Sequence, residues 1–167
     1  MKKLSLILFL VFFLSACGDA EENDDEEQNF DDEISAQEEA CLHILEGPFA
    51  VSDATLEVDD SSGNINRAHH SYTVSLVENT DGDYQGAVIY DASASDAYGI
   101  FTNIDVEVAV FTEQQESLTV TTTEVDECIE VARQHTVEMD EGRHFIFFGP
   151  TTDSEVSVVV EELSEFE

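Results

Sequence analysis

The feature that most constrains the fold is a succession of short β-rich runs after residue 48. Val, Ile, Thr, Tyr and Phe concentrate in these runs, with an alternating apolar and polar pattern that is typical of strands. Clusters rich in Asp, Gly, Pro and Asn lie between many of them and predict turns. The expected strands are 49–58, 72–77, 84–90, 98–102, 106–111, 118–122, 135–139, 145–148 and 156–160.

Many short strands without a second long helix predict an all-β fold, an antiparallel β-sandwich or jelly roll over residues 34–167. One short helix is expected before the strands. Ser35 and Glu38 have the spacing of a capping box, and Gly47-Pro48 is a stop signal.

The expected helix presents different residues on different faces. At helical spacing, Cys41, Ile44 and Leu45 share a face, whereas His43 points elsewhere.

The first seventeen residues predict export and a lipid anchor. Two lysines precede an apolar run, 4–14, which is too short for a membrane span of about 20 residues. The run ends in Leu14-Ser15-Ala16-Cys17, which resembles the lipobox of bacterial lipoproteins. The resemblance implies that signal peptide 1–16 is removed and that Cys17 carries the lipid, so that the protein contacts the membrane through its anchor.

Residues 17–33 are expected to form a disordered acidic tether. Residues 18–31 contain eight acids and no base, and Phe30 is the one large apolar side chain of the tether. Gly18 follows the anchor cysteine, where an aspartate would resemble the inner-membrane retention signal of enterobacterial lipoproteins. We therefore expect a bacterial envelope protein in the outer membrane, on its periplasmic or surface face.

The net charge of the chain restricts the kinds of molecule that can bind it. Without residues 1–16 the chain has three arginines, no lysine and all thirty-nine acids, a formal charge of −36. Such a chain repels nucleic acid and anionic lipid and attracts cations or a basic envelope protein.

The two remaining cysteines, Cys41 and Cys128, predict a disulfide, because an even pair in an exported chain is normally oxidised. The bond would link the helix to residues 124–132, a segment that suits either a helical turn or the start of the next strand.

Two segments repeat a pattern of strand, acidic Gly turn and strand: 72–84 and 135–145. The repeat is similar to the small β-sandwich modules of the bacterial pre-peptidase C-terminal type. That similarity implies a domain without catalytic residues of its own.

Residue motifs also favour a non-enzymatic domain. The sequence has no G-x-S-x-G turn, no phosphate-binding glycine loop and no tryptophan for a sugar platform. The function predicted first is therefore a lipid-anchored, non-enzymatic binding or interaction module.

The alternative is a protein that binds zinc or copper through His69, His70, His135 and, with them, His144. Calcium is a weaker alternative, since residues 81–88 match only the first half of an EF-hand loop and Ala92 stands where the loop requires Glu. We expect no tight zinc or copper site, because adjacent His69 and His70 would face opposite sides of a regular strand. The first prediction therefore has no cofactor.

Overall fold

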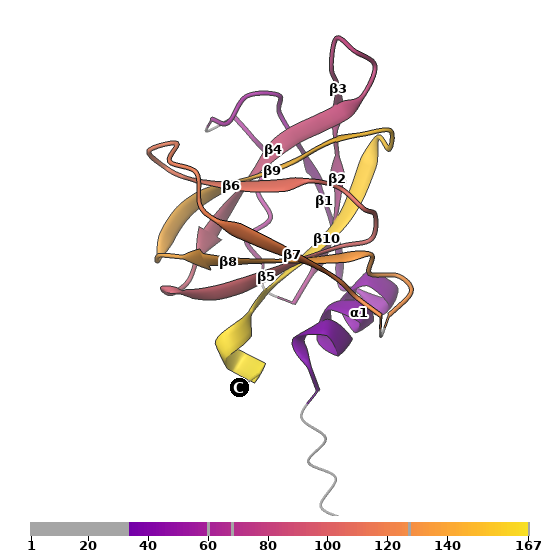
Figure 1. Ribbon diagram of the computed structural model, residues 1–167, viewed down its shortest axis with the longest axis vertical. Coiled ribbons are helices and arrows are strands. Elements are labelled where there is room, and N and C mark those ends of the chain that lie inside the picture. The colour runs from indigo at the N-terminus through magenta and orange to yellow at the C-terminus, as the bar shows by residue number, and fades with distance from the viewer. Residues whose placement is uncertain (1–33, 60, 68, 127, 167) are drawn as a thin grey trace, which may run out of the picture. The chain divides into compact units, whose positions relative to one another are not determined.

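The computed structural model describes residues 34–59, 61–67, 69–126 and 128–166. Within these ranges the protein is an all-β sandwich of ten strands in two sheets, preceded by one α-helix (Figure 1). This confirms the predicted fold class. The predicted signal peptide 1–16, the lipidated Cys17 and the tether 17–33 lie outside the described residues.

One sheet has six strands in the order β1-β2-β10-β5-β8-β7, and the other has four in the order β3-β4-β9-β6. Neighbouring strands are antiparallel except β1 and β2, which are parallel. The strands are β1 (Phe49–Asp53), β2 (Ser71–Ser75), β3 (Val77–Glu78), β4 (Tyr84–Ala92), β5 (Asp96–Thr102), β6 (Val108–Thr112), β7 (Val120–Glu124), β8 (Arg133–Met139), β9 (Gly142–Thr151) and β10 (Glu155–Glu162).

All nine predicted runs contain strands. Two of the runs are interrupted where the chain passes from one sheet to the other. The run 72–77 divides at Leu76 into β2 of the larger sheet and β3 of the smaller one. The run 49–58 keeps strand structure only in β1, and Thr55 then bridges to Ala87 in the smaller sheet. The segment 124–132 contains the end of β7 and a loop, and β8 starts at Arg133.

The two segments with the repeated pattern differ in the structure. The turn at residues 79–83 closes a hairpin, because β3 pairs with β4. The turn at residues 140–141 instead connects β8 of one sheet to β9 of the other. The repeated pattern of strand, turn and strand therefore forms a hairpin in the first segment only.

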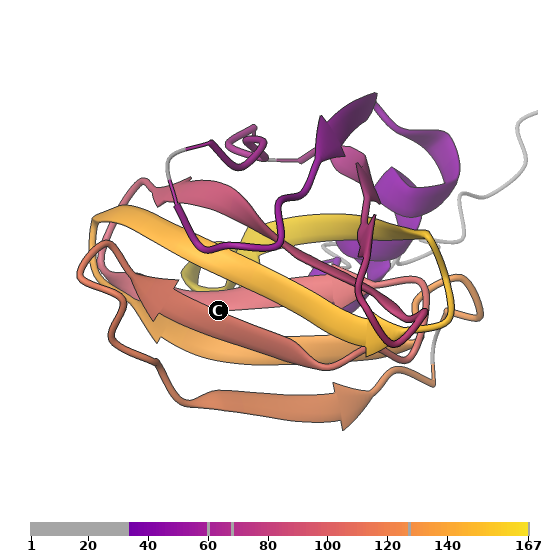
Figure 2. The same ribbon diagram turned by 90° about the horizontal axis from the view of Figure 1, so that it is seen from above.

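The helix α1 (Ala36–Glu46) begins with the predicted capping box, in which Ser35 and Glu38 each bond the other's backbone N–H. It ends at Gly47, whose φ of 81° favours glycine. Its Cys41 and Ile44 pack against the apolar cluster under the helix, whereas Leu45 of the same predicted face remains 52% exposed. Figure 2 shows α1 packed beside β1.

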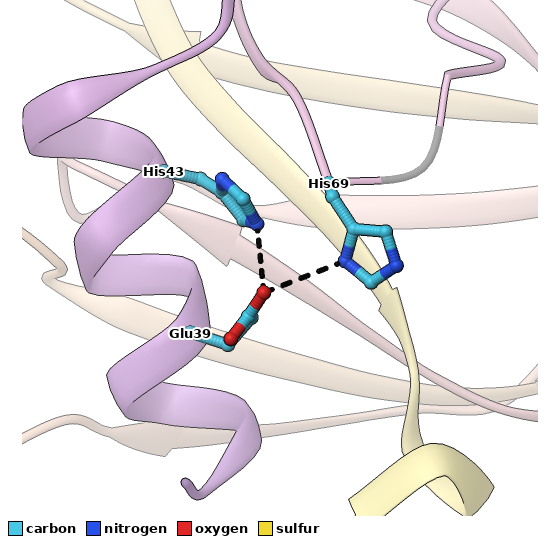
Figure 3. Close-up of side chains that lie close together, drawn as sticks. All are labelled: Glu39, His43 and His69. Atoms are coloured by element: carbon cyan, nitrogen blue, oxygen red, sulfur yellow. Dashed lines mark hydrogen bonds and ion pairs between the residues drawn. The ribbon is translucent and has the colours of Figure 1, made fainter.

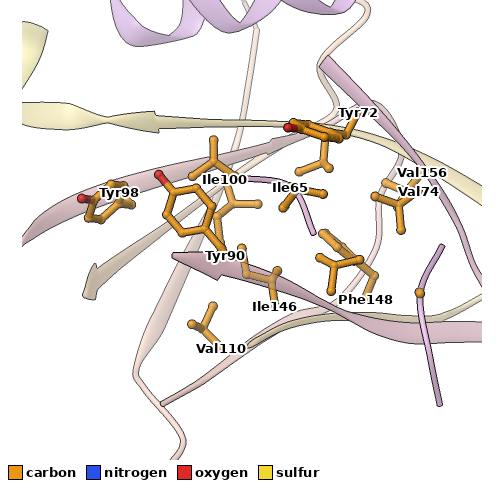
Figure 4. Close-up of a cluster of buried hydrophobic side chains, with 14 of the residues drawn as sticks. Ile65, Tyr72, Val74, Tyr90, Tyr98, Ile100, Val110, Ile146, Phe148 and Val156 are labelled. Carbon is orange, nitrogen blue, oxygen red and sulfur yellow. The ribbon is translucent and has the colours of Figure 1, made fainter. Parts of the chain in front are cut away.

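Most of the core lies between the two sheets, where aliphatic side chains pack with three tyrosines, Tyr72, Tyr90 and Tyr98 (Figure 4). The rings of Tyr90 and Tyr98 meet edge to face, with centroids 5.6 Å apart. A smaller apolar cluster lies under α1 and consists of Ala40, Phe101, Val125, Cys128, Val131 and Val159.

The alternation of side chains in β10 links the two clusters. Val156, Val158 and Val160 face the main core, whereas Val159 belongs to the cluster under α1. Because strand side chains repeat every two residues, Glu161 lies on the same face as Val159. The strand therefore places a carboxylate under the helix.

Neither α1 nor the short 3-10 helix η1 (Leu163–Phe166), within the part of the chain that is described, has the length and apolarity that a membrane crossing requires.

Candidate functional site

The predicted disulfide between Cys41 and Cys128 is present and joins α1 to the loop between β7 and β8. The two Cα atoms are 6.0 Å apart, within the normal range for a disulfide.

Two imidazoles and two carboxylates converge between α1 and the larger sheet. Glu39 and His43 lie one turn apart on α1, His69 precedes β2, and Glu161 is in β10. Figure 3 shows the side chains of Glu39, His43 and His69 pointing toward one another. We call these four residues the Glu39–Glu161 cluster.

The polar atoms of the cluster lie close together. Nε2 of His43 is 3.1 Å from Oε1 of Glu39 and 3.8 Å from Oε1 of Glu161. Nδ1 of His69 is 3.7 Å from Oε1 of Glu39 and 3.1 Å from Oε2 of Glu161. The two ring nitrogens and the Glu39 oxygen all lie within 4.8 Å of one another.

Glu161 is the most unusual member, because its side chain is 1% exposed and neither of its oxygens accepts a hydrogen bond. Burial raises the pKa of Glu161 to about 8, and the negative charges of Glu39 and Glu165 add to the rise. A buried carboxylate without a hydrogen-bond donor is costly unless a cation compensates it.

His43 is oriented by a backbone contact. Its Nδ1 lies 3.1 Å from the carbonyl oxygen of Gly47, to which it donates as N–H. In the neutral ring this tautomer leaves a lone pair on Nε2, the atom that faces Glu39 and Glu161. A lone pair and carboxylate oxygens repel each other, so a proton or a metal ion must lie between them.

His69 also presents a nitrogen to the cluster from a constrained position. Its backbone φ is 53°, in the left-handed region that residues other than Gly rarely adopt. Its Nδ1 is buried without a hydrogen bond, and its Nε2 lies 3.7 Å from Oε2 of Glu165. A carboxylate behind a ligating imidazole is a common arrangement at metal sites.

The distances between the nitrogens and oxygens of the cluster are close to those between ligand atoms around a small divalent transition metal. Zinc binds His nitrogen and carboxylate oxygen at about 2.0–2.2 Å, so tetrahedral ligands lie about 3.4 Å apart. The four distances between a nitrogen and an oxygen of the cluster run from 3.1 to 3.8 Å, with His43 facing one oxygen of Glu161 and His69 the other. Glu39, His43 and His69 already lie at the spacing of metal ligands, and Glu161 would complete the set by turning one oxygen toward them.

The histidines named from the sequence do not converge. Of the four histidines that the sequence suggested as ligands, only His69 belongs to the Glu39–Glu161 cluster. Among the described residues, two groups of three ligand-type side chains have their ligand atoms within 4.8 Å: Glu39, His43 and His69, and Cys41, Cys128 and Glu130. The cysteines of the second group form the disulfide.

The other three histidines have separate environments. The ring of His70 lies 6.3 Å from that of Tyr72. His135 is buried in β8 with its Nδ1 2.9 Å from the Thr122 hydroxyl; burial, and then the charge of Arg133, lower its pKa to about 4. His144 is buried in β9 and bonds the Gly142 carbonyl through Nδ1.

The acidic turn that resembles the first half of an EF-hand loop is stabilised by ordinary hydrogen bonds from side chain to backbone. In the hairpin between β3 and β4, the side-chain oxygen of Asn79 accepts hydrogen bonds from the backbone N–H groups of Asp81 and Asp83. Such bonds are typical of an Asx turn.

Sequence reasoning missed Glu39, His43 and Glu161. Two signals were available. Glu39 and His43 are four residues apart on an expected helix, which places them side by side. Glu161 continues the alternation of an apolar strand on the side of buried Val159.

Comparison of the sequence with known proteins found no relative. The sequence matches no protein-family model, and no curated protein is significantly similar to it.

Proposed function

We propose that this protein is a lipid-anchored protein of the bacterial envelope whose sandwich domain binds a divalent transition metal, zinc above all, through the Glu39–Glu161 cluster. The observation that carries the proposal is the buried Glu161 carboxylate, which lacks a hydrogen-bond donor and faces one nitrogen of each imidazole. The proposal replaces the expectation of no tight site, which was based on the opposite orientations expected for adjacent His69 and His70 and did not consider Glu39, His43 and Glu161.

The ligand atoms favour zinc over calcium and magnesium. Calcium and magnesium prefer oxygen ligands, whereas imidazole nitrogen suits zinc, copper and nickel. The cluster supplies two nitrogens and two carboxylates, whose charges balance those of a divalent ion. The raised pKa of Glu161 means that its carboxyl holds a proton at neutral pH in the metal-free protein, and a divalent ion would displace that proton on binding.

The proposed role is binding without catalysis. Four protein ligands complete the tetrahedral shell of zinc, whereas catalytic zinc normally keeps a position for water. A strongly acidic chain also raises the local concentration of cations, which suits capture of metal at an envelope surface. Anchorage through Cys17 and residence in the outer membrane belong to the same proposal.

Zinc titration by calorimetry tests the site. The purified protein is first stripped with a chelator and then kept in excess calcium and high salt, which occupy and screen the diffuse carboxylates. We expect one zinc per chain at micromolar affinity or better. The variant His43→Ala should lose this binding.

The matched control is His70→Ala, which removes the neighbouring histidine outside the cluster and should bind zinc as the wild type does. Loss of binding in His70→Ala with retention in His43→Ala would contradict the proposed ligands. Absence of one-to-one binding to the wild type would contradict the function itself.

A second candidate function, docking of an envelope protein, has support from the edge of the larger sheet. In edge strand β1, Phe49 and Val51 are 64% and 80% exposed. Exposed apolar side chains on a strand edge favour strand addition by a partner. A photocrosslinker at Val51 should trap that partner, whereas one at Thr122 on the opposite edge strand β7 should not.

A further inference from the structure

Helix α1 carries both half of the Glu39–Glu161 cluster and one end of the disulfide. Cys41 lies two residues after Glu39 and two residues before His43, and it bonds Cys128 in the loop between β7 and β8. The other two proposed ligands belong to different parts of the fold, the segment before β2 and strand β10. Any movement of α1 therefore separates the two pairs of ligands.

Helix α1 is held to the sheet mostly by partly buried side chains, among them Ala36, Cys41 and Ile44. Of its eleven residues, all of which the structure describes, only Ala40 is buried. Leu42 and Leu45 are 42% and 52% exposed, and a hydrogen bond joins Gln37 to Gln134. A helix of this length is marginal in isolation, so its position depends on what holds it. The disulfide is its one covalent link across the fold among the described residues.

We infer that the Cys41–Cys128 disulfide controls metal affinity at the Glu39–Glu161 cluster, so that its reduction releases the metal. This inference rests on the proposed function. In the oxidised protein the bond holds Glu39 and His43 against His69 and Glu161. In the reduced protein α1 moves away from the sheet, and the four ligands are no longer held at metal-binding distances.

The reductant is a dithiol. One of its thiolates attacks the disulfide, the S–S bond breaks through a mixed disulfide, and the dithiol leaves oxidised. The two electrons and two protons it supplies convert Cys41 and Cys128 to thiols. A surface hollow of about 320 Å³, lined by Ile34, Glu38 and Leu42 beside the two cysteines, gives access to the bond.

Thermodynamic linkage makes the inference quantitative. If oxidation increases zinc affinity by a given factor, zinc must stabilise the disulfide against reduction by the same factor. For this two-electron couple, each tenfold change in affinity lowers the reduction potential by about 30 mV.

Zinc affinity is measured in the oxidised protein, in protein reduced with a dithiol and desalted without oxygen, and in Cys41→Ser/Cys128→Ser. We expect the affinity of the last two to be roughly tenfold weaker or more. The disulfide potential, measured in thiol redox buffers with and without zinc, should shift by the matching amount. In His43→Ala zinc should not shift this potential.

Hydrogen exchange separates local release of α1 from unfolding of the domain. After reduction, the amides of α1 should exchange faster while those of β4 and β9 keep their protection. Loss of protection in β4 and β9 would overturn the inference, because metal release would then follow global unfolding. Equal zinc affinity in the two redox states would also overturn it while leaving the proposed function intact.

Tighter zinc binding after reduction would overturn the inference as well. It would show that the Cys41 and Cys128 thiolates with Glu130 take the metal themselves. Absence of zinc binding to the oxidised wild type is a different result, which contradicts the proposed function.

Discussion

Replacing Glu161 by Gln should stabilise the metal-free protein at high pH while abolishing its response to zinc. In the folded protein the pKa of Glu161 is raised from 4.5 to about 8 by burial and by the nearby charges of Glu39 and Glu165. Between these pH values the folded state holds a proton that the unfolded chain has released. The free energy of unfolding is therefore highest below pH 4.5 and falls as the pH rises toward 8.

The pKa shift of Glu161 gives the size of the change in unfolding free energy. Each pKa unit corresponds to about 1.4 kcal/mol, so the wild type loses at most about 5 kcal/mol of stability across this range. Glutamine removes the charge but leaves a buried amide without partners, at a cost of about 1–3 kcal/mol. We therefore expect Glu161→Gln to unfold with a free energy about 2–4 kcal/mol higher than the wild type at about pH 9.

Urea denaturation with a chelator present measures this difference. The advantage of Glu161→Gln should reverse below pH 4.5, where the wild-type carboxyl is protonated in both states and the variant keeps only the cost of its buried amide, about 1–3 kcal/mol. Zinc should raise the urea midpoint of the wild type and leave that of the variant unchanged. The matched control is Glu162→Gln, since Glu162 bonds Ser93 and lies outside the cluster.

Lower stability of Glu161→Gln than of the wild type at high pH without metal would refute the reasoning. Glu161 would then be a counter-ion that the imidazoles need for stability, and no metal would be required to explain its burial.

Three further predictions concern other parts of the chain. The variant Cys41→Ser/Cys128→Ser should lose about 4–5 kcal/mol of unfolding free energy, because the disulfide joins residues 87 apart in sequence; an unchanged urea midpoint would contradict this. Since burial lowers the pKa of His135 from 6.5 to about 4, folding loses up to about 3 kcal/mol as the pH falls through this range. His135→Gln should therefore show a smaller loss of stability between these pH values, and an equal loss would refute the assignment. Cys17→Ser should accumulate as an unlipidated precursor by mass spectrometry, and wild-type protein should fractionate with outer-membrane markers; a lipidated variant would exclude Cys17 as the anchor.

The strands could be predicted because a two-sheet core requires alternation of side chains. The same alternation could not show where the chain changes sheets. Leu76 is buried between β2 and β3, so its apolar character continues the pattern across the break. Thr55 likewise continues a β-rich run although its partner Ala87 belongs to the other sheet.

The disulfide followed from the number of cysteines and the expected compartment, and the structure confirms it. The Glu39–Glu161 cluster could not be found in the same way. Its residues stand at positions 39, 43, 69 and 161, and only the pairing of strands brings the last two together with α1. His43 was set aside because it lies off the face that Cys41, Ile44 and Leu45 share. In fact the inner surface includes the adjacent polar stripe of Glu39 and His43.

Crystallography of the protein with zinc, using anomalous scattering at the zinc absorption edge, tests the central claim most directly. One strong anomalous peak should lie about 2.0–2.2 Å from Nε2 of His43, Nδ1 of His69 and an oxygen each of Glu39 and Glu161. Peaks confined to surface carboxylates or to His70, with these four side chains free of metal, would contradict the account.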